Sequence, residues 1–424
     1  MSRPLFSQNI ETAFEDAVGI AGAECKRYEH WYAKALAVVP EHLKNPPRQA
    51  APIYALPGRT DDLAEIEVIA TTIAEHFSDL VVIGMGGSSL SGDVLSYLRK
   101  EGGLRLHFVD NIDPHTLALL VETLPWATTS FLIISKSGGT VETLAQLAVF
   151  LREAKKRLPG SYGKHFTVIT IANDNILQRV AGEHGMRVVA HDVDLGGRFS
   201  ILSAVGLIPA AAVGVNIRAL RDGAAITLAE NSGALLAAAG EAAVLHMALT
   251  EKNIRMQIFM HYSDRLTGLA LWHRQCWAES LGKMGQGMTP IPSRGATDQH
   301  SQMQLYLEGP RDKFFTSVML DMAGQGAAID FDNGDASLDY LKGHTLGDLA
   351  MAEQRATNST LVKAGRPLRT ITCAALDEAT LGALLMHFSL EVGFTAALMG
   401  VNAYDQPAVE AGKKLALDYL AGKA

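Results

Sequence analysis

The chain has 424 residues, 48% of them hydrophobic and 19% charged, which is typical of a globular protein and is too long for one simple core. Its net charge of −8 argues against general nucleic-acid binding, although a local cationic cleft can still attract an anionic ligand. The cysteines are few and widely separated, which argues against a disulfide framework and favours the cytoplasm: they are Cys25, Cys276 and Cys373.

The N-terminal segment is polar and acidic and lacks the apolar core of a signal peptide. No uninterrupted apolar run in the chain is long enough to span a bilayer, so we expect no membrane segment. Residues Asn9 to Val39 predict one long helix, which Pro40, Pro46 and Pro47 end. We therefore expect residues 1–60 to form a helical segment that packs on the rest of the protein.

Short apolar strands alternate with helices in the next part of the chain, which we assign to a first lobe, residues 61–220. Glycine- and serine-containing loops connect several of these strands to helices, one ending near Leu98 and one covering Thr140 to about Leu158. Such strand–loop–helix repeats predict an α/β fold with a parallel sheet covered by helices. The predicted strands are Leu80–Ile83, Leu104–Val109, Phe131–Ile134, His165–Ile171 and Arg187–Ala190.

The second half repeats this pattern less regularly, and we assign residues 221–424 to a second α/β lobe, with the boundary near residues 200–235. The predicted strands are Ile254–Tyr262, Phe314–Leu320 and Leu368–Ala374. The predicted helices are Arg265–Leu281, Thr345–Lys363 and Glu378–Met399. The segment Gly282–Gly295 is rich in glycine and proline, which favours a functional loop over a linker.

The loop after the first strand has the sequence VVIGMGGSSLSG, residues 81–92. Glycines let a backbone approach a ligand, and the free N–H groups at a helix start favour an anion near Ser88 and Ser89. The alternative is a tight turn capped by serine. The spacing matches neither a dinucleotide fingerprint nor a P-loop, which counts against a nucleotide-binding enzyme.

A second loop, FLIISKSGGTVET at residues 131–143, places several hydroxyls and one ammonium at a helix start. Its candidate ligand groups are Ser135, Lys136, Ser137 and Thr140. These groups suit a phosphate monoester, whereas a helix cap formed by Thr140 would need only one hydroxyl. Because both loops follow strands of one predicted parallel sheet, we expect them to face one crevice and form one phosphosugar site.

Two further motifs each allow two interpretations. In DVDLGGRFSILSAVGL, Arg198 follows two glycines and either stabilises an oxyanion or forms a salt bridge to Asp192 or Asp194. In WHRQCWAESLGK, the residues Gln275, Glu279 and Lys283 share one helix face. Glu279 is a candidate general base, but the spacing by itself favours a surface ion pair with Lys283.

The last two motifs are polar and lie toward the C-terminus. PIPSRGATDQHSQMQLYLEGP contains Asp298 and His300, and a histidine suits proton transfer near neutral pH, although a lone one usually only forms hydrogen bonds. In AYDQPAVEAGKKLALDYL, Pro407 starts a helix with Gln406 at its entrance, and Lys413 resembles an ordinary surface charge. No segment supplies three or four ligands at metal-site spacing.

These six motifs, in this order from about Val81 to Lys413, resemble the glucose-6-phosphate isomerase family. GGRFS followed by an apolar helix resembles one signature of that family, and PIPSRGATDQHSQMQLYLEGP resembles its short bacterial form. The resemblance implies two phosphosugar-isomerase-type (SIS) lobes, each a mainly parallel sheet covered by helices, with the active site between them.

The resemblance also implies a role for each candidate residue. The phosphate-binding set is Ser88, Ser135, Lys136, Ser137 and Thr140. The residues near the reacting C1 and C2 oxygens are Gly87, Gly197 and Arg198. Glu279 would be the base, with Gln275 beside it. His300 and Lys413 would assist ring opening, with Gln406 nearby.

The implied reaction is the reversible conversion of glucose 6-phosphate to fructose 6-phosphate in glycolysis and gluconeogenesis, through a cis-enediol and without cofactor or metal. The family also implies a homodimer whose active site takes its histidine from the partner subunit, in the cytoplasm, with no nucleic-acid or membrane partner. The rival hypotheses are an amino-sugar phosphate isomerase and a non-catalytic sugar-phosphate sensor. A sensor does not need Glu279, His300 and Lys413 together, and no N-terminal cysteine nucleophile is present for a glutamine-dependent enzyme.

Overall fold

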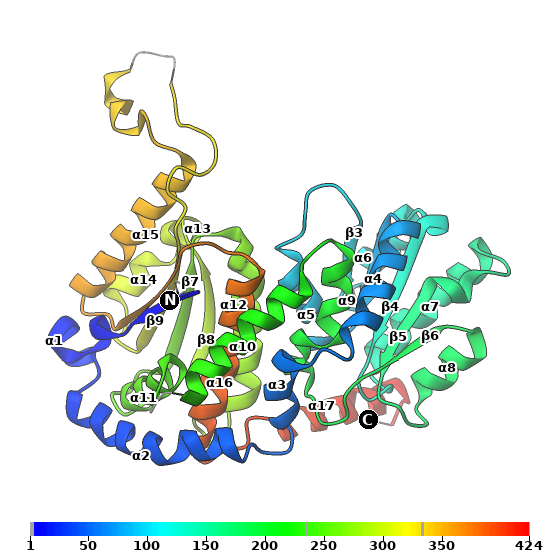
Figure 1. Ribbon diagram of the computed structural model, residues 1–424, viewed down its shortest axis with the longest axis horizontal. Coiled ribbons are helices and arrows are strands. Elements are labelled where there is room, and N and C mark those ends of the chain that lie inside the picture. Colours follow the sequence, from blue (N-terminus) through cyan, green and yellow to red (C-terminus); the bar gives the residue numbers. More distant parts are fainter. Residues whose placement is uncertain (1–3, 234–235, 332–334, 424) are drawn as a thin grey trace.

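Two five-stranded sheets organise the chain, and helices cover each of them (Figure 1). The structure is a computed structural model that describes residues 4–233, 236–331 and 335–423. The sheets stand side by side in the long direction of the molecule. The α/β class and the two predicted lobes are therefore confirmed.

The first sheet has the strand order β3-β2-β4-β5-β6, and all neighbouring strands are parallel. Its strands are β2 (Asp79–Ile83), β3 (Arg105–Val109), β4 (Thr129–Ile134), β5 (Phe166–Thr170) and β6 (Arg187–Ala190). All five lie at the predicted places. In this parallel order, the loops after β2 and β4 emerge at the same edge of the sheet.

The central strands β2, β4 and β5 are buried along their whole length and mainly apolar, because helices cover both of their faces. Leu80 and Val82 of β2 belong to a core that includes α4 and α9, whereas Val81 and Ile83 pack in a second core with α6, α7 and α8. This division follows the alternation of side chains along a strand. The helices of this lobe are α4 (Leu63–His76), α5 (Gly87–Ser96), α6 (Pro114–Thr123), α7 (Val141–Arg157), α8 (Ile176–His184) and α9 (Ala204–Ala212).

The second sheet has the order β1-β10-β9-β7-β8, in which β1 is antiparallel to β10 and the other neighbours are parallel. Its strands are β1 (Ser7–Asn9), β7 (Met256–His261), β8 (Thr289–Arg294), β9 (Lys313–Leu320) and β10 (Leu368–Cys373). The longer helices around it are α2 (Cys25–Lys44), α10 (Ile217–Gly233), α11 (Ala238–Thr250), α12 (Thr267–Leu281), α15 (Leu346–Lys363) and α16 (Glu378–Met399).

The prediction of one helix from Asn9 to Val39 is wrong. Residues 7–9 form β1 on the edge of the second sheet, short turns follow, and the long helix α2 begins only at Cys25. A side chain at Gly22 would lie 2.4 Å from the backbone of Phe14, so the chain turns tightly here instead of continuing as a helix. Pro40 lies inside α2 and does not end it, although proline removes one backbone hydrogen bond from the helix.

The glycine- and proline-rich segment 282–295 contains a strand that the sequence did not predict. Residues Thr289–Arg294 form β8, in which Pro290 and Pro292 pair with Gln257 and Phe259 of β7. Proline cannot donate to a sheet ladder, and β8 tolerates two prolines because it is an edge strand with a neighbour on one side only.

Helix α16 is long and apolar enough to cross a membrane by length and composition. However, 89% of its most apolar 18-residue window is buried, and it packs against α2, α10, α11 and α12. It is thus the central helix of the second lobe (Figure 1).

The chain passes from the first lobe to the second between α9 and α10. Helix α9 packs against α4 and α5, whereas α10 packs against α16. The short α3 (Ala51–Ala55) lies between α2 and α4 in the chain. The exact boundaries at residues 60 and 220 stay a prediction.

A fully buried ion pair lies inside the second lobe. Arg369 Nη1 is 2.9 Å from Glu391 Oε2, and His246 Nε2 is 2.7 Å from Glu391 Oε1. Burial would raise the pKa of Glu391, but Arg369 and His246 outweigh it and hold that pKa well below its usual range. The pair therefore joins β10 to α11 and α16 through charges that cannot reach water.

We expect Arg369→Met to lower the free energy of unfolding by about 3–5 kcal/mol, because it leaves the buried carboxylate of Glu391 without its cation. Chemical denaturation measures this change. The matched control is Arg218→Met, which removes an exposed pair with Glu67 and should cost at most about 1 kcal/mol. Equal losses in the two variants would contradict a structural role for the buried pair.

Candidate active site

The glycine loop after β2 is pressed between the two lobes. A Cβ atom at Gly87 would lie 2.2 Å from the carbonyl oxygen of Gly197, so only glycine fits there. Gly86 has φ +56°, and a Cβ atom on it would lie 2.9 Å from Nε2 of Gln275 on α12. The structure thus brings Gly87, Gly197 and Gln275 together where the two lobes meet.

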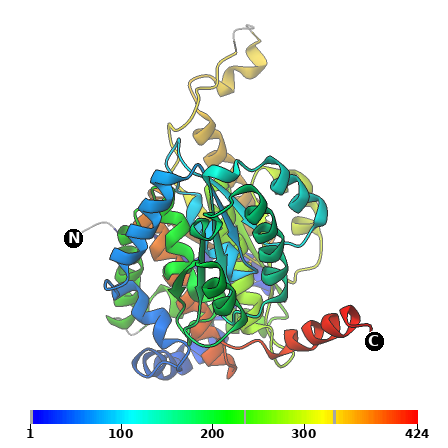
Figure 2. The ribbon, with the colours of Figure 1, turned by 90° about the vertical axis from the view of Figure 1, so that its right-hand side faces the viewer.

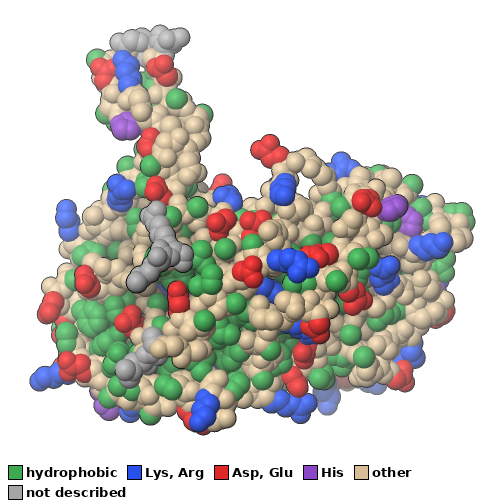
Figure 3. Space-filling view, in the orientation of Figure 1, with side chains coloured by type: hydrophobic (Ala, Val, Ile, Leu, Met, Phe, Trp, Pro, Cys, Tyr) green, Lys and Arg blue, Asp and Glu red, His purple; other side chains and the backbone are tan. Residues whose placement is uncertain are grey.

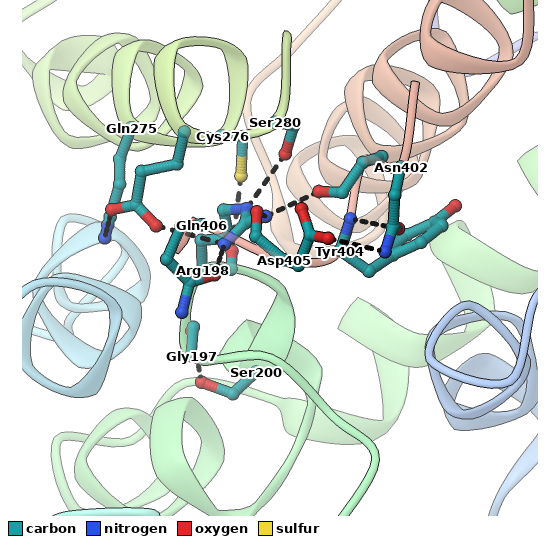
Figure 4. A network of polar contacts seen from close by, with 12 residues as sticks. Gly197, Arg198, Ser200, Gln275, Cys276, Ser280, Asn402, Tyr404, Asp405 and Gln406 are labelled. Atoms are coloured by element: carbon teal, nitrogen blue, oxygen red, sulfur yellow. Dashed lines mark hydrogen bonds and ion pairs between the residues drawn. The ribbon is translucent and has the colours of Figure 1, made fainter. Parts of the chain in front are cut away.

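Arg198 is buried in the 3-10 helix η6 (Gly197–Leu202), and α12 holds it from the second lobe (Figure 4). Its carbonyl oxygen accepts hydrogen bonds from Trp272 Nε1 at 2.8 Å and Cys276 Sγ at 3.2 Å. Its Nε donates to Ser280 Oγ at 2.8 Å. The main chain and side chain of this arginine are therefore both fixed by one face of a helix from the other lobe.

Glu279 is the anionic partner of Arg198. Its Oε2 lies 3.0 Å from Arg198 Nη1, and its Oε1 accepts a hydrogen bond from Gln275 Nε2 at 2.8 Å. The Glu279 side chain is 33% exposed. Two donors therefore orient a carboxylate that remains open to a ligand. Arg198 therefore pairs with Glu279 and not with Asp192 or Asp194, the partners that the sequence had left possible.

The segment after α16, residues 402–406, completes the cluster. Arg198 Nη1 donates to Gln406 Oε1 at 2.8 Å, and Nη2 donates to the carbonyl oxygens of Ala403 and Asp405. Lys283 binds Asp405 at 2.7 Å. The sequence spacing favoured a surface ion pair between Lys283 and Glu279, and that pair is not formed. Residues 208 positions apart in the sequence therefore meet at one guanidinium.

The second predicted loop leads from β4 to α7. Ser135 Oγ and Thr140 Oγ1 are 2.9 Å apart, and the side chain of Thr140 does not cap α7. The cap interpretation of Thr140 therefore fails. Gly138 has φ +66°, and a Cβ atom on it would lie 1.9 Å from Oδ1 of Asn175, the residue that caps α8. The loop is thus shaped by glycine against a neighbouring helix start.

The two loops are neighbours at the carboxyl ends of the strands of the first sheet. A Cβ atom at Gly84 would lie 2.9 Å from Cβ of Ser88 and 3.2 Å from the carbonyl oxygen of Ile134, where β4 ends. Ser88 does not cap α5, whose first residue is Gly87. The hydroxyls of Ser88, Ser135 and Thr140 therefore lie on adjacent strand ends.

Lys136 and Ser137 belong to the same loop. The Ser137 hydroxyl accepts a hydrogen bond from the backbone N–H of Gly139 at 3.2 Å. Lys136 is half-buried, and burial lowers its pKa, although Asp194 and Asp192 offset part of this effect. An ammonium with few charge partners beside several hydroxyls is suited to a phosphate group.

His300 and Lys413 are not part of this cluster. His300 is exposed on the short helix α13 (Thr297–Ser301), and Lys413 lies on α17 (Glu410–Leu420), where it binds Glu410 at 2.8 Å. The Lys413 side chain is 63% exposed, and α17 lies apart from the body of the protein (Figure 2). Among the described residues, the hydrogen bonds of Arg198 and Glu279 involve neither side chain.

Sequence reasoning missed the residues that support the cluster. Trp272, Cys276 and Ser280 repeat every four residues, and this spacing was a usable signal for a second helix face beside Gln275 and Glu279. Asp405 gave no such signal, because its partner is far away in the sequence. In residues 4–233, 236–331 and 335–423, no three His, Cys, Asp or Glu side chains gather as metal ligands.

Two solved structures share the fold of this chain. A crystal structure of a hypothetical protein from Thermus thermophilus covers 98% of this chain and 100% of its own, with a TM-score of 0.89 and 32% identity. A crystal structure of a glucose-6-phosphate isomerase from Chlamydia trachomatis covers 99% of this chain and 89% of its own, with a TM-score of 0.79 and 20% identity. These likenesses and the two mainly parallel sheets define a two-lobed α/β fold that this chain shares with a glucose-6-phosphate isomerase.

The sequence comparisons are more specific. The model of the phosphoglucose isomerase family matches residues 68–291 and 336–421. The glucose-6-phosphate isomerase of Rubrobacter xylanophilus is 37% identical over 416 residues, which is 94% of this chain and 94% of that protein. This chain belongs to the phosphoglucose isomerase family.

We expect the affinity for a sugar phosphate to fall with rising pH before the ordinary lysine pKa is reached. The pKa of Lys136 is lowered, so its ammonium loses its proton early on the alkaline side and no longer attracts the anion. Titration calorimetry across pH measures this, and Lys136→Met should weaken binding and flatten the alkaline limb. The exposed Lys164→Met is the control, and an unchanged limb in Lys136→Met would place the phosphate elsewhere.

Proposed function

We propose that this chain is a glucose-6-phosphate isomerase that interconverts glucose 6-phosphate and fructose 6-phosphate. The observation that carries the proposal is the carboxylate of Glu279, which Gln275 and Arg198 orient beside the loops that carry Ser88 and Ser135. A fixed, accessible base next to a cationic group and a phosphate cradle suits proton transfer next to a carbonyl.

The phosphate group would bind the hydroxyls and ammonium of the β4–α7 loop. Those groups are Ser135, Lys136, Ser137 and Thr140, with Ser88 on the adjacent loop. Because the phosphate does not react, its binding energy serves to place C1 and C2 of the sugar near Glu279.

Glu279 then takes the proton from C2. The electrons of that C–H bond form a C1–C2 double bond, and the oxygen of the C1 carbonyl becomes the negatively charged oxygen of a cis-enediolate. Arg198 stabilises the negative charge from its buried position, where a preorganised cation is most effective. The proton on O2 passes to O1, and Glu279 returns its proton to C1 in the direction of the ketose. The electrons shift within the substrate, so the reaction consumes no external oxidant, reductant or cofactor.

Ring opening precedes this step and needs a proton to move between the ring oxygen and the anomeric oxygen. We assign it to His300 and Lys413, with Gln406 beside Arg198. Since His300 is exposed on α13 of its own chain, we propose that the partner subunit's His300 completes each active site.

A projecting arm supports the homodimer. Residues 321–331 and 335–345, which lie between β9 and α15 and include the 3-10 helix η8 (Ala336–Leu341), stand clear of the body in Figures 1 and 3. Tyr340 on this arm is 71% exposed and Leu346 at its base is 58% exposed. Exposed apolar side chains on a projecting arm fit an arm that packs on a second subunit.

We also propose that the protein works in the cytoplasm, in glycolysis and gluconeogenesis. Its three cysteines form no disulfide: Cys25 is exposed, and Cys276 and Cys373 are buried. Thiols that remain reduced are typical of that compartment.

Glu279→Gln should lower kcat by about 100- to 10,000-fold and leave substrate affinity nearly unchanged, because the amide keeps the shape but cannot take a proton. The assay starts from fructose 6-phosphate and follows NADPH through glucose-6-phosphate dehydrogenase, with and without EDTA. Glu75→Gln, an exposed carboxylate on α4, is the control. Normal turnover in Glu279→Gln would remove it as the base, and tight sugar-phosphate binding without turnover in the unaltered protein would favour a sensor.

Mixing two inactive variants tests the shared site. In a dimer of Glu279→Gln with His300→Asn, one active site keeps both the base of one chain and the partner's His300. When the two variants are refolded together or coexpressed and pair at random, about half of the dimers are mixed. About one in four of all active sites should therefore be active. If both residues acted within one chain, the mixture would stay as inactive as its components.

A further inference from the structure

Lys283 lies four residues after Glu279 and two residues after the end of α12 at Leu281, and it binds the segment Asn402–Gln406 instead of that carboxylate. Its ammonium donates to Asp405 Oδ1 at 2.7 Å, to the Asp405 carbonyl oxygen at 2.8 Å and to the carbonyl oxygen of Asn402. The Lys283 side chain is only 15% exposed, whereas that of Asp405 is 52% exposed. Three acceptors from one short segment therefore surround a single, largely buried cation.

Hydrogen bonds within the segment 402–406 brace it next to this ion pair, and Figure 4 shows these internal bonds. Asn402 Nδ2 donates to Asp405 Oδ2 at 3.0 Å, and the N–H of Tyr404 donates to Asn402 Oδ1 at 2.9 Å. The hydrogen bond from Lys283 holds the pKa of Asp405 below its usual range, so the ion pair stays charged at neutral pH. Lys283 therefore binds both the carboxylate and the backbone of a preformed turn.

Two cations from opposite lobes hold the same turn. Arg198 binds the carbonyl oxygens of Ala403 and Asp405 from the first lobe, and Lys283 binds from the second. Arg198 also binds Glu279, so it cannot give its whole charge to the turn. Lys283 makes no such contact with the catalytic carboxylate, and its charge is committed to the turn.

Helix α17 depends on this turn for its place. The structure describes all of α17, and none of its residues is buried. Gln406 immediately precedes the 3-10 turn η9 (Pro407–Val409) that leads into α17, and Lys413 lies one turn inside that helix. The position of the turn therefore determines the position of Gln406 and of the helix that carries Lys413.

We propose that Lys283 is a positioning residue that fastens the turn 402–406, and thereby holds Gln406 and α17 for the ring-opening step. The kinetic part rests on the proposed isomerase function, whereas the fastening itself does not. A purely electrostatic effect of Lys283 on Glu279 is the competing explanation, and it would not need Asp405.

Hydrogen exchange tests the fastening without reference to activity. In Lys283→Met, amides of residues 402–420 should exchange faster while the sheets keep their protection. Lys283→Arg, which retains a cation and donors, should restore most of the protection. Lys414→Met is the matched control, because it removes an exposed lysine from the same C-terminal segment. Unchanged exchange in Lys283→Met would overturn the proposal.

Kinetics test the consequence. Displacing Gln406 and α17 should lower kcat/KM of Lys283→Met by about 10- to 100-fold. With glucose 6-phosphate deuterated at C2 as the substrate, the kinetic isotope effect on kcat/KM should fall toward one, because ring opening then limits the rate in place of proton transfer. Faster exchange with unchanged kcat/KM, or a lower rate with an unchanged or larger isotope effect, would overturn the assignment to ring opening. A merely destabilised protein would lose active enzyme without a change in the isotope effect.

The double-mutant cycle of Lys283→Met with Asp405→Ala separates fastening from a field effect on Glu279. If the two act through one ion pair, the double variant should lose no more than the worse single variant. Additive losses would overturn the ion-pair explanation. Should Lys283→Met not fold, Asp405→Ala carries the exchange and isotope measurements by itself. Absence of turnover in the unaltered protein would refute the isomerase function, while the exchange result would still decide the fastening.

Discussion

The buried guanidinium of Arg198 is the interaction on which the site depends. A cation that has lost its water must be satisfied by fixed partners, and Arg198 finds them in Glu279, Ser280, Gln406 and two backbone carbonyls. These partners come from α12 and from the turn after α16, so satisfying one charge joins the lobes. The same requirement orients the carboxylate of Glu279, so the pairing that joins the lobes also places the proposed base.

Close backbone approach allows this arrangement to form. The contact between Gly87 and Gly197 leaves no room for a Cβ atom, and it brings the loop after β2 against the arginine and against α12. The loop that we propose binds phosphate lies on the adjacent strand end because β2 and β4 are parallel neighbours. The distance between this loop and Glu279, the proposed base, is thereby set by rigid strands and one rigid helix, which suits the positioning of a small substrate.

The parts assigned to ring opening are held differently. Glu279 and Arg198 lie in the packed interface between the lobes, whereas His300 and Lys413 lie on short or exposed helices at the surface. Such elements need an external support to act with precision. For Lys413 we propose that the Lys283–Asp405 pair supplies this support, and for His300 that a second subunit does. Under this proposal, proton transfer at C2 is built into the single chain and ring opening is completed by assembly.

The sequence by itself determined the strands of the first sheet, the two loops that follow β2 and β4, and the family, since apolar runs, glycines and hydroxyls in these places are local signals. It failed at β1, where edge pairing with β10 and not helix periodicity decided the conformation, and at β8, whose prolines are tolerated only because it is an edge strand. Only the tertiary structure decided that Arg198 pairs with Glu279 and Lys283 with Asp405. Local spacing suggested other partners for both cations, because a buried charge selects the acceptors that the packed lobes bring to it, and those lie up to 208 residues away.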